Sequence, residues 1–318
     1  MKKSIVIIFL LPLITFAQAN KFFRQGERAT DLKEKIDLFS QAIELEPKHL
    51  DAYFQRAVAK DNIGDYHGAI LDYTKVLFYE PDADSYYNRG NSKYKLSDFV
   101  GAIEDYTKAL ELDPEFLAAR YSLGFTKYEL QDYEGAVEEL SKFLQAFPES
   151  DTALRQRAFA YSALKKPLLA LRDFTFTILI NPTSEAFYNR GTAYMDINYY
   201  QEANNDFHKA IRIDKTNAPA YFFRGASHFF LGEYDKAISD FNTAISFDSL
   251  DFDAVFGLAL TYYKMGDLEK AKLQFEKTIR ILKTTSENKE GINLFKNTYW
   301  FLNQYYTFYD NYQKLSGL

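Results

Sequence analysis

Five arginines in this chain of 318 residues are each followed, sixteen residues later, by an aspartate. A planar guanidinium group can donate to both oxygens of one carboxylate, and such a pair is strong where water is excluded. We interpret the pairs as structural rather than as a ligand site, because an arginine facing a carboxylate has little charge left for a phosphate or carboxylate ligand. The predicted ion pairs are Arg56 with Asp72, Arg89 with Asp105, Arg157 with Asp173, Arg190 with Asp206 and Arg224 with Asp240.

The other residue types that do chemistry are not arranged for catalysis. The four histidines (His49, His67, His208 and His228) are far apart in the sequence, and none has a second ligand at metal-binding spacing. The chain has no cysteine, which excludes disulfides, thiolate zinc sites and cysteine nucleophiles. It also has no glycine-rich loop of the kind that binds phosphate. We therefore expect neither enzymatic activity nor a metal or other cofactor.

The elements that carry the ion pairs repeat with a period of about 34 residues, which predicts stacked helical hairpins. In an antiparallel hairpin, a separation of sixteen residues places each arginine opposite its aspartate on the facing helix. Small residues at two positions of the repeat would let the two helices approach closely. The prolines that mark the period are Pro47, Pro81, Pro114, Pro148 and Pro182.

One copy of the repeat reads Tyr86-Tyr87-Asn88-Arg89-Gly90, then Asp98-Phe99, Ala102, Tyr106, Ala109 and Pro114. This order resembles the tetratricopeptide repeat (TPR) family in nearly every diagnostic position. The resemblance implies an all-α fold, a right-handed superhelical solenoid of antiparallel helix hairpins with about eight repeats and a C-terminal capping helix. In each hairpin we call the first helix A and the second helix B.

The resemblance, together with the patterns at the two ends of the chain, predicts the domain organisation. It extends from about Asn20 to about Lys283. The expected segments are a signal peptide over 1–19, a degenerate first repeat over 20–49, seven repeats over 50–82, 83–116, 117–150, 151–183, 184–217, 218–251 and 252–283, and an aromatic-rich capping segment over 284–318.

Aromatic residues are abundant, with 25 tyrosines and 29 phenylalanines. The family geometry points the fifth residue of helix A into the concave groove, and residues one or two turns later share that face. An aromatic groove suits an extended peptide or an amphipathic helix, although some of these rings could instead pack against the adjacent hairpin. The predicted groove residues are Phe54, Tyr87, Tyr121, Phe125, Tyr128, Arg155, Phe159, Tyr188, Phe222, Phe229, Phe256 and Tyr263.

After Lys283 the period breaks, and a ring-rich segment runs from Ile292 to Tyr312. We predict that this segment caps the last repeat, since the terminal repeat of a solenoid needs its apolar face covered. Docking of the segment to another subunit or partner is the alternative, and the single tryptophan, Trp300, would report on it.

The N-terminus has the order of a secretory signal. Lys2 and Lys3 precede an apolar run, and Ala17-Gln18-Ala19 predicts cleavage before Asn20; an uncleaved anchor is the alternative. The absence of cysteine excludes lipid attachment at an N-terminal cysteine. We therefore expect an exported protein, periplasmic or associated with the outer envelope, that is not a lipoprotein and has no membrane span after signal removal.

The net charge and the aromatic residues indicate which class of partner this protein binds. The net charge of −6 disfavours nucleic acid or an anionic membrane. The resemblance implies an interaction scaffold that holds a peptide or helix of another protein in its groove. The alternative is a carbohydrate- or cell-wall-binding receptor, in which rings stack on sugars and nearby polar groups bind hydroxyls. Those polar groups would be Asp51, Asn62, Glu185 and Asp196. The oligomeric state stays open.

Overall fold

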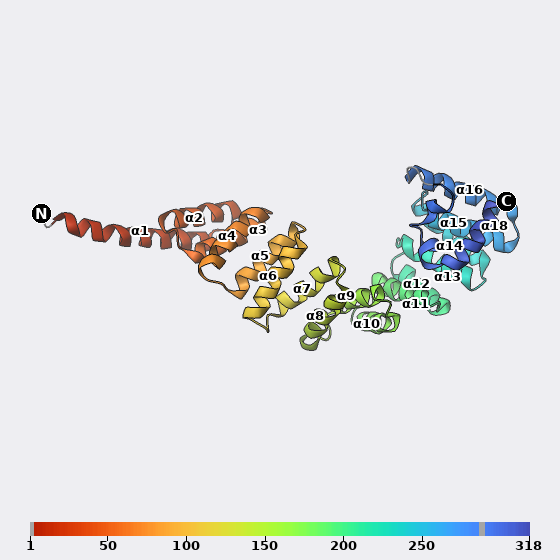
Figure 1. Cartoon of the computed structure of the whole chain (residues 1–318), viewed down its shortest axis with the longest axis horizontal. Coiled ribbons are helices and arrows are strands. Elements are labelled where there is room, and N and C mark those ends of the chain that lie inside the picture. Colours follow the sequence, from red (N-terminus) through yellow and green to blue (C-terminus); the bar gives the residue numbers. More distant parts are fainter. Residues whose placement is uncertain (1–2, 286–289) are drawn as a thin grey trace. The chain divides into compact units, whose positions relative to one another are not determined.

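The structure, a computed structural model, describes residues 3–285 and 290–318. Within those ranges every regular element is a helix. The chain divides into two compact units, which we call unit 1 (residues 1–148) and unit 2 (residues 149–318). Each unit is a stack of antiparallel helix pairs, so the chain is an all-α TPR-type solenoid, as the sequence predicts (Figure 1).

In unit 1, each helix A packs against the helix B that follows it, and the first three helices B pack against the helix A of the next hairpin. The helices of unit 1 are α1 (Lys3–Arg28), α2 (Leu32–Leu45), α3 (Leu50–Asn62), α4 (Tyr66–Tyr79), α5 (Ala83–Lys95), α6 (Phe99–Leu112), α7 (Leu117–Glu129) and α8 (Tyr133–Ala146).

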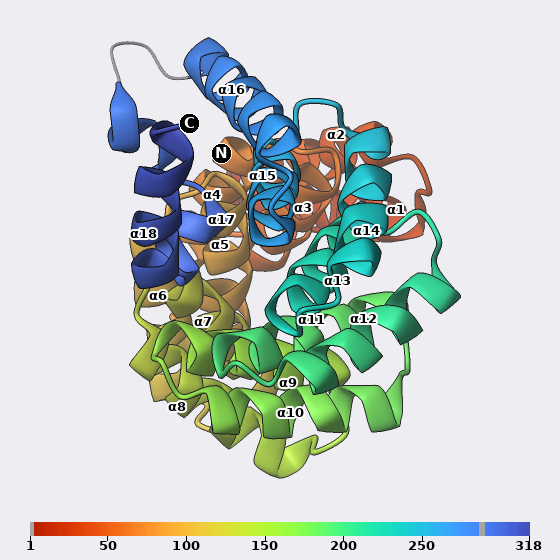
Figure 2. The same cartoon turned by 90° about the vertical axis from the view of Figure 1, so that its right-hand side faces the viewer.

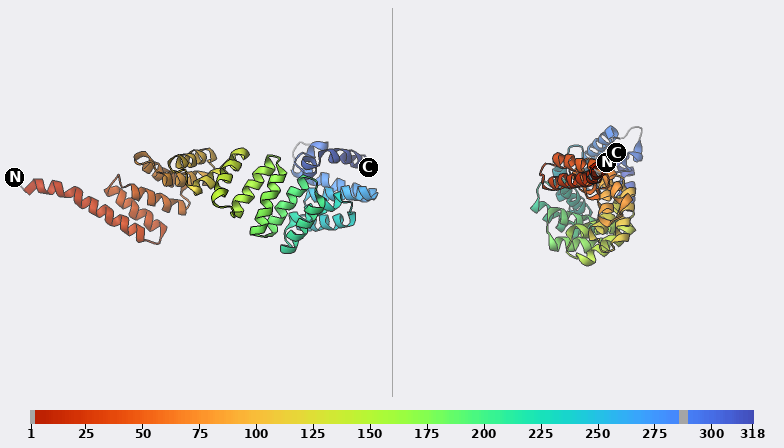
Figure 3. Two further views of the ribbon diagram at one scale, coloured as in Figure 1. Left: turned by 90° about the horizontal axis from the view of Figure 1, so that it is seen from below. Right: turned by 90° about the vertical axis from the view of Figure 1, so that its left-hand side faces the viewer.

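Unit 2 contains four further hairpins and a C-terminal segment, and Figure 3 shows its first hairpins (green) as successive antiparallel pairs. The hairpin helices are α9 (Asp151–Ala163), α10 (Pro167–Ile180), α11 (Ser184–Asp196), α12 (Tyr200–Ile213), α13 (Ala218–Phe230), α14 (Tyr234–Phe247), α15 (Phe252–Met265) and α16 (Leu268–Thr285). The C-terminal segment consists of the 3₁₀ helix η1 (Gly291–Phe295), α17 (Tyr299–Asn303) and α18 (Tyr305–Ser316).

Many of the helices begin after a residue whose side chain caps the first turn. The helices A after the first begin at Leu50, Ala83, Leu117, Asp151, Ser184, Ala218 and Phe252, the residues at which the sequence places the starts of repeats. Several helices B begin after an aspartate: Asp65, Asp98 and Asp132 each accept a hydrogen bond of 3.0 Å from the backbone N–H three residues later. These bonds satisfy amides that the first helical turn leaves without a partner.

The turn between helix A and helix B requires one residue in the left-handed conformation. Gly64, Gly232 and Gly266 have φ between 77° and 85° at this place. In four other repeats the same conformation is adopted by Ser97, Gln131, Lys165 and Asn198, with φ between 56° and 62°. Helix termination therefore uses the same backbone geometry with or without glycine.

Close approach of the two helices depends on small residues facing a ring. A Cβ atom added at Gly191 would lie 2.6 Å from Phe207, whose ring is fully buried. We expect Gly191→Ala to lower the free energy of unfolding of unit 2 by about 1–3 kcal/mol, because the packed ring cannot withdraw without strain. Urea unfolding monitored by circular dichroism measures this loss. An unchanged midpoint would show that the hairpin can open at no cost.

The first helix continues through the expected signal cleavage point. α1 is unbroken from Lys3 to Arg28 and extends past its partner α2 (Figure 1). Ala19 is fully buried, and Gly26 lies against the ring of Phe39 in α2. Residues after Asn20 therefore include the part of α1 that completes the degenerate first hairpin.

The C-terminal segment folds back onto the last hairpins of unit 2. α18 contacts α15 and α16. Figure 2 shows α13, α14, α15 and α16 (cyan to blue) as the successive helices of the last two hairpins. Leu294, Phe295, Trp300, Phe308 and Leu315 are all buried and join the core cluster of the preceding repeats. The expected capping segment begins at residue 284, and residues 286–289 of it lie outside the described residues.

Candidate functional site

The structure brings together all five arginine–aspartate pairs of the sequence analysis. In each, arginine Nε and one terminal nitrogen donate to the two carboxylate oxygens over 2.6 to 3.0 Å. The aspartate side chains are 1–7% exposed and the arginines 13–17%. The hydrogen bond to Asp206 raises the pKa of Arg190, and that to Asp240 raises the pKa of Arg224. The pairs are thus bidentate and nearly buried.

Several of these arginines also reach the preceding hairpin, which the sequence analysis did not predict. Arg56 donates to the hydroxyl of Ser40 in α2 at 2.9 Å, and Arg89 donates to Thr74 in α4 at 3.0 Å. Arg190 donates to Thr175 in α10 at 3.3 Å. The sequence did contain a signal for these bonds. In each case a serine or threonine lies fifteen or sixteen residues before the arginine, at a fixed position of the repeat. Each such arginine therefore joins three helices.

The fourth repeat keeps the ion pair with different residues. Leu123 occupies the arginine position, and Glu139 stands in place of the aspartate. Glu139 accepts instead from Arg120, one helical turn earlier on α7, at 3.0 Å, and Lys127 lies 3.7 Å from its other oxygen. A cation from the same helix face thus balances the buried carboxylate where the usual arginine is missing.

The predicted groove residues of unit 1 lie on the helices A and remain partly exposed. Phe54, Tyr87, Tyr121, Phe125 and Tyr128 are each half-buried. Phe54 packs edge-on against Tyr73 at 5.6 Å between ring centroids, and Tyr87 lies 4.9 Å from Phe116. Each ring therefore contributes to the hairpin packing and still leaves part of its surface to solvent.

Two of these rings line a pocket of about 450 Å³, which we call the unit 1 pocket. Its walls come from α5, α6 and α7. The ring centroid of Phe125 lies 6.1 Å from that of Tyr94 and 6.4 Å from that of Tyr121. The lining residues are Asn91, Tyr94, Lys95, Tyr106, Tyr121, Ser122, Phe125 and Thr126.

The unit 1 pocket offers apolar ring faces and a few polar groups. The Tyr106 hydroxyl donates to Asn91 Oδ1 at 2.8 Å. Burial raises the pKa of Tyr106 and of Tyr94, so both phenols are neutral hydrogen-bonding groups at physiological pH. A cavity of this size with apolar walls and a few convergent polar groups is typical of a binding site.

In unit 2 the predicted groove residues divide into two sets. Arg155, Phe159, Tyr188 and Tyr263 are half-buried. Arg155 is 33% exposed and lies 3.4 Å from Glu185 on the next helix A. Phe159 packs edge-on against Phe174, and Tyr188 against Phe223.

The prediction that Phe222, Phe229 and Phe256 line a free groove is wrong. These side chains are only 7%, 5% and 1% exposed, because the C-terminal segment covers them. The ring of Trp300 lies between them, and Phe295 and Phe308 pack against Phe256. The groove face of the last hairpins is therefore filled by the chain itself, and Trp300, at 1% exposure, belongs to the core rather than to a surface.

Asp253 in α15 anchors the C-terminal segment. Its two carboxylate oxygens accept from the backbone N–H of Tyr299 at 2.9 and 3.1 Å, and its backbone oxygen accepts from Trp300 Nε1 at 2.8 Å. Burial, with a contribution from nearby Asp251, raises the pKa of Asp253 to about 7. The carboxyl group therefore takes up a proton far more readily in the folded chain than an exposed aspartate does.

This pKa predicts that unit 2 loses stability as pH rises. The contribution of Asp253 is fully present below about pH 4, the ordinary aspartate range, and is lost as pH rises through about 7. We expect a fall of roughly 3 kcal/mol in the unfolding free energy across that window. Urea unfolding at pH 4.5 and pH 8 measures it. Asp253→Asn should remove most of the difference, and the same slope in that variant would refute the assignment to Asp253.

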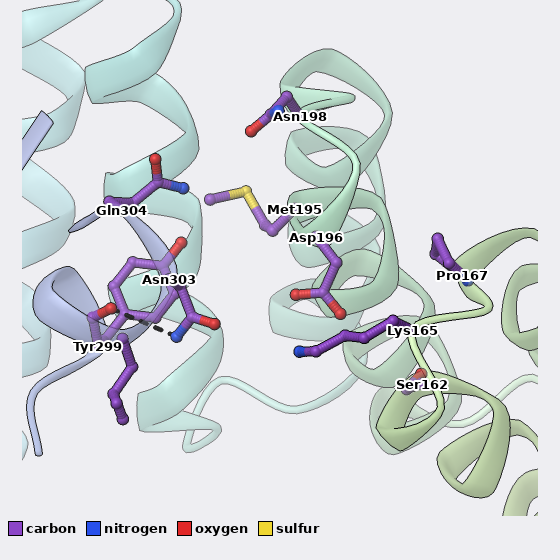
Figure 4. A pocket seen from close by; sticks show the side chains of 10 residues that line it. Ser162, Lys165, Pro167, Met195, Asp196, Asn198, Tyr299, Asn303 and Gln304 are labelled. Carbon is purple, nitrogen blue, oxygen red and sulfur yellow. Dashed lines mark hydrogen bonds between the residues drawn. The ribbon is translucent and has the colours of Figure 1, made fainter. Parts of the chain in front are cut away.

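A second pocket, of about 410 Å³, lies in unit 2 beside the C-terminal segment. Figure 4 shows Lys165 and Asp196 on one side of it and Tyr299, Asn303 and Gln304 on the other. Asn303 donates to the backbone oxygen of Tyr299 at 3.3 Å. The lining residues are Ser162, Lys165, Pro167, Met195, Asp196, Asn198, Tyr299, Leu302, Asn303 and Gln304, and we call this cavity the polar pocket.

The described residues contain neither a metal-binding cluster nor a helix that could span a membrane. Nowhere in residues 3–285 and 290–318 do three or more His, Asp or Glu side chains form a group that could hold a metal ion. Among the helices that the structure describes, none combines the length and apolar character that crossing a membrane requires.

Family models of the tetratricopeptide repeat match residues 83–116, 118–150, 184–217 and 253–281, and a TPR repeat model matches 227–266. No curated protein matches the sequence. Among solved structures, MamA is 25% identical, with a TM-score of 0.51 over 56% of this chain and 98% of its own.

Two further structures share the fold. YrrB, described as a TPR protein with an unusual peptide-binding site, is 24% identical, with a TM-score of 0.52 over 57% of this chain and 95% of its own. The C-terminal part of a TPR repeat-containing protein from Cytophaga hutchinsonii is 17% identical, with a TM-score of 0.62 over 76% of this chain and 99% of its own. The helix pairs, the repeat period and the matches to the family models together identify the chain as a member of the tetratricopeptide repeat family.

Proposed function

We propose that this chain is a non-enzymatic interaction scaffold that binds a segment of a partner protein through the unit 1 pocket. The observation that carries the proposal is the pocket itself, about 450 Å³ in volume and lined by half-buried rings on successive helices A. Rigid rings with polar edges make good anchors for a peptide, because little conformational entropy is lost on binding. The fold similarity to YrrB, a protein described as having a peptide-binding site, supports the same class of ligand.

The test is an affinity capture from envelope extract with the chain from Asn20 onward. We expect Tyr121→Ala combined with Phe125→Ala to lose a protein that the parent retains, with circular dichroism confirming that both are folded. Phe78→Ala is the matched control, because that ring is 77% exposed and lies on α4 outside the pocket. Equal retention by all three proteins would overturn the proposal.

Export to the cell envelope is part of the same proposal. It is supported by the order of charged, apolar and small residues at the N-terminus. Mass spectrometry of the protein recovered from its native host tests the signal. A mature N-terminus at Asn20 in an envelope fraction is expected, whereas an intact residue 1 in a cytosolic fraction would contradict it.

A carbohydrate ligand is the second candidate, and the polar pocket favours it. One carboxylate (Asp196) and the side-chain amides of Asn198, Asn303 and Gln304 surround the opening next to the Tyr299 ring. Hydroxyl groups of a sugar could bind these groups. Binding of cell-wall oligosaccharides that weakens at least fivefold on Asp196→Asn would support this candidate, and equal binding by the variant would remove it.

A further inference from the structure

The site that Trp300 fills in unit 2 has a defined place in the repeat. Five side chains surround the indole with ring centroids 5.7 to 6.3 Å away, and the indole N–H donates to the backbone oxygen of Asp253. Three of these side chains belong to α13, one belongs to α14 and one belongs to α15. The five are Phe222, Phe229, Phe230, Phe241 and Phe256.

The unit 1 pocket stands at the same place, four repeats earlier. Residues that are 135 positions apart in the sequence occupy the same position of the repeat in the two units, as Gly90 and Gly225 do. The equivalents of the five side chains around Trp300 are therefore Tyr87, Tyr94, Lys95, Tyr106 and Tyr121. All but Tyr87 line the unit 1 pocket. One of two equivalent sites thus holds an aromatic ring of the chain itself, and the other is a cavity.

We propose that the unit 1 pocket binds an aromatic side chain of a partner protein, presented at the first turn of a short helix as Trp300 is presented at the start of α17. This inference rests on the proposed function and specifies its ligand. Trp300 is the second residue after Thr298, whose hydroxyl caps α17 by accepting from the N–H of Phe301 at 3.2 Å. A partner segment of this kind has a capping residue followed by one or two rings.

The residues that differ between the Trp300 site and the unit 1 pocket indicate which type of aromatic side chain the pocket binds best. Phe229, Phe241 and Phe256 are replaced by Tyr94, Tyr106 and Tyr121, and Phe230 is replaced by Lys95. These changes add three hydroxyls and one exposed cation to the walls of the pocket. Tryptophan or tyrosine, each with a polar edge, suits such walls better than phenylalanine does. The lysine favours a partner ring with an acidic neighbour.

The backbone of the bound segment is held differently in the two sites. In unit 2 the Asp253 carboxylate accepts from the N–H of Tyr299. The equivalent residue in unit 1 is Ala118, the exposed second residue of α7, which has no acceptor side chain. Binding in unit 1 therefore depends mainly on the ring. Adding a carboxylate at residue 118 should strengthen binding, since it can cap the helix of the bound segment.

A labelled peptide with the sequence of residues 296–304 is the probe, and its affinity for the chain from Asn20 onward is measured by fluorescence anisotropy. We expect Ala118→Asp to tighten binding at least threefold and Tyr94→Ala to weaken it at least tenfold. A peptide with alanine in place of tryptophan should also bind at least tenfold more weakly. Phe78→Ala, outside the pocket, is the control and should leave the affinity unchanged.

The remaining outcomes overturn the inference in distinguishable ways. Binding that is the same for Tyr94→Ala and Ala118→Asp would mean that the peptide occupies another site, such as that of the chain's own C-terminal segment. Equal binding of the peptide without tryptophan would show that the pocket does not select rings. No binding of the peptide, with capture of an envelope protein still dependent on Tyr121 and Phe125, would refute this inference and leave the proposed function standing.

Discussion

Replacing Arg190 with alanine is expected to lower the free energy of unfolding of unit 2 by about 3 kcal/mol. The substitution removes both hydrogen bonds to Asp206, at 2.6 and 2.8 Å. The carboxylate, which is 3% exposed, then has as its nearby cation the half-exposed Lys209, whose Nζ lies 3.8 Å from one oxygen. It also removes the bond from Arg190 to Thr175 of the preceding hairpin. Because Trp300 is the single tryptophan and is buried in unit 2, its fluorescence in a urea titration measures the loss.

Two comparisons isolate the ion pair from other effects of the substitution. Arg155→Ala in the same unit breaks an ion pair with Glu185 whose side chains are 33% and 61% exposed, and it should cost less than about 1 kcal/mol. A double-mutant cycle of Arg190→Ala with Asp206→Ala should give a coupling energy of at least about 1.5 kcal/mol. A coupling energy near zero would mean that the two side chains do not stabilise each other.

Trp300→Ala is expected to destabilise unit 2 by about 4 kcal/mol, the largest effect of any single substitution considered for this chain. The indole contacts rings from α13, α14 and α15 and donates to the Asp253 backbone oxygen, so its removal leaves a cavity in the core and an acceptor without its partner. The release of α17 would also expose Phe222 and Phe229. Circular dichroism in urea gives the stability, and binding of a hydrophobic dye reports the exposed rings.

Leu302→Ala is the matched control for Trp300. Leu302 belongs to the same short helix but is 64% exposed, so its truncation should change the unfolding free energy by no more than about 0.5 kcal/mol. Equal effects of the two substitutions would show that helix propensity in α17, rather than burial of the indole, holds the C-terminal segment. A Trp300→Ala protein as stable as its parent would show that the segment is not part of the core.

The ion pairs could be predicted from sequence because both partners lie at fixed positions of one hairpin. Arg56 and Asp72 are sixteen residues apart, and a hairpin that turns between them has little freedom to separate them. Glu139 was not assigned its partner, because Arg120 lies at a different position of the repeat and the choice among nearby cations depends on side-chain reach. The bond from Arg89 to Thr74 joins two hairpins and likewise required the packed structure.

The rings of the predicted groove show the limit of the same reasoning. The face of each helix A follows from helical periodicity, which is why Tyr121 and Phe125 could be assigned to one surface. Periodicity does not say what covers that surface. Phe222, Phe229 and Phe256 occupy the same repeat positions as half-buried rings elsewhere in the chain, yet they are almost fully buried. The ring-rich sequence around Trp300 needed burial somewhere, and only the folded chain identifies the place.

The sequence by itself determined the all-α repeat fold, the helix starts and the five ion pairs, because these depend on local spacing within one hairpin. Only the tertiary structure decided that the groove face of the last repeats is occupied and that an equivalent cavity remains in unit 1. The physical reason is that the C-terminal segment lies outside the repeat period. Its position is set by side-chain packing and by hydrogen bonds such as those to Asp253, between residues 46 and 47 positions apart in sequence.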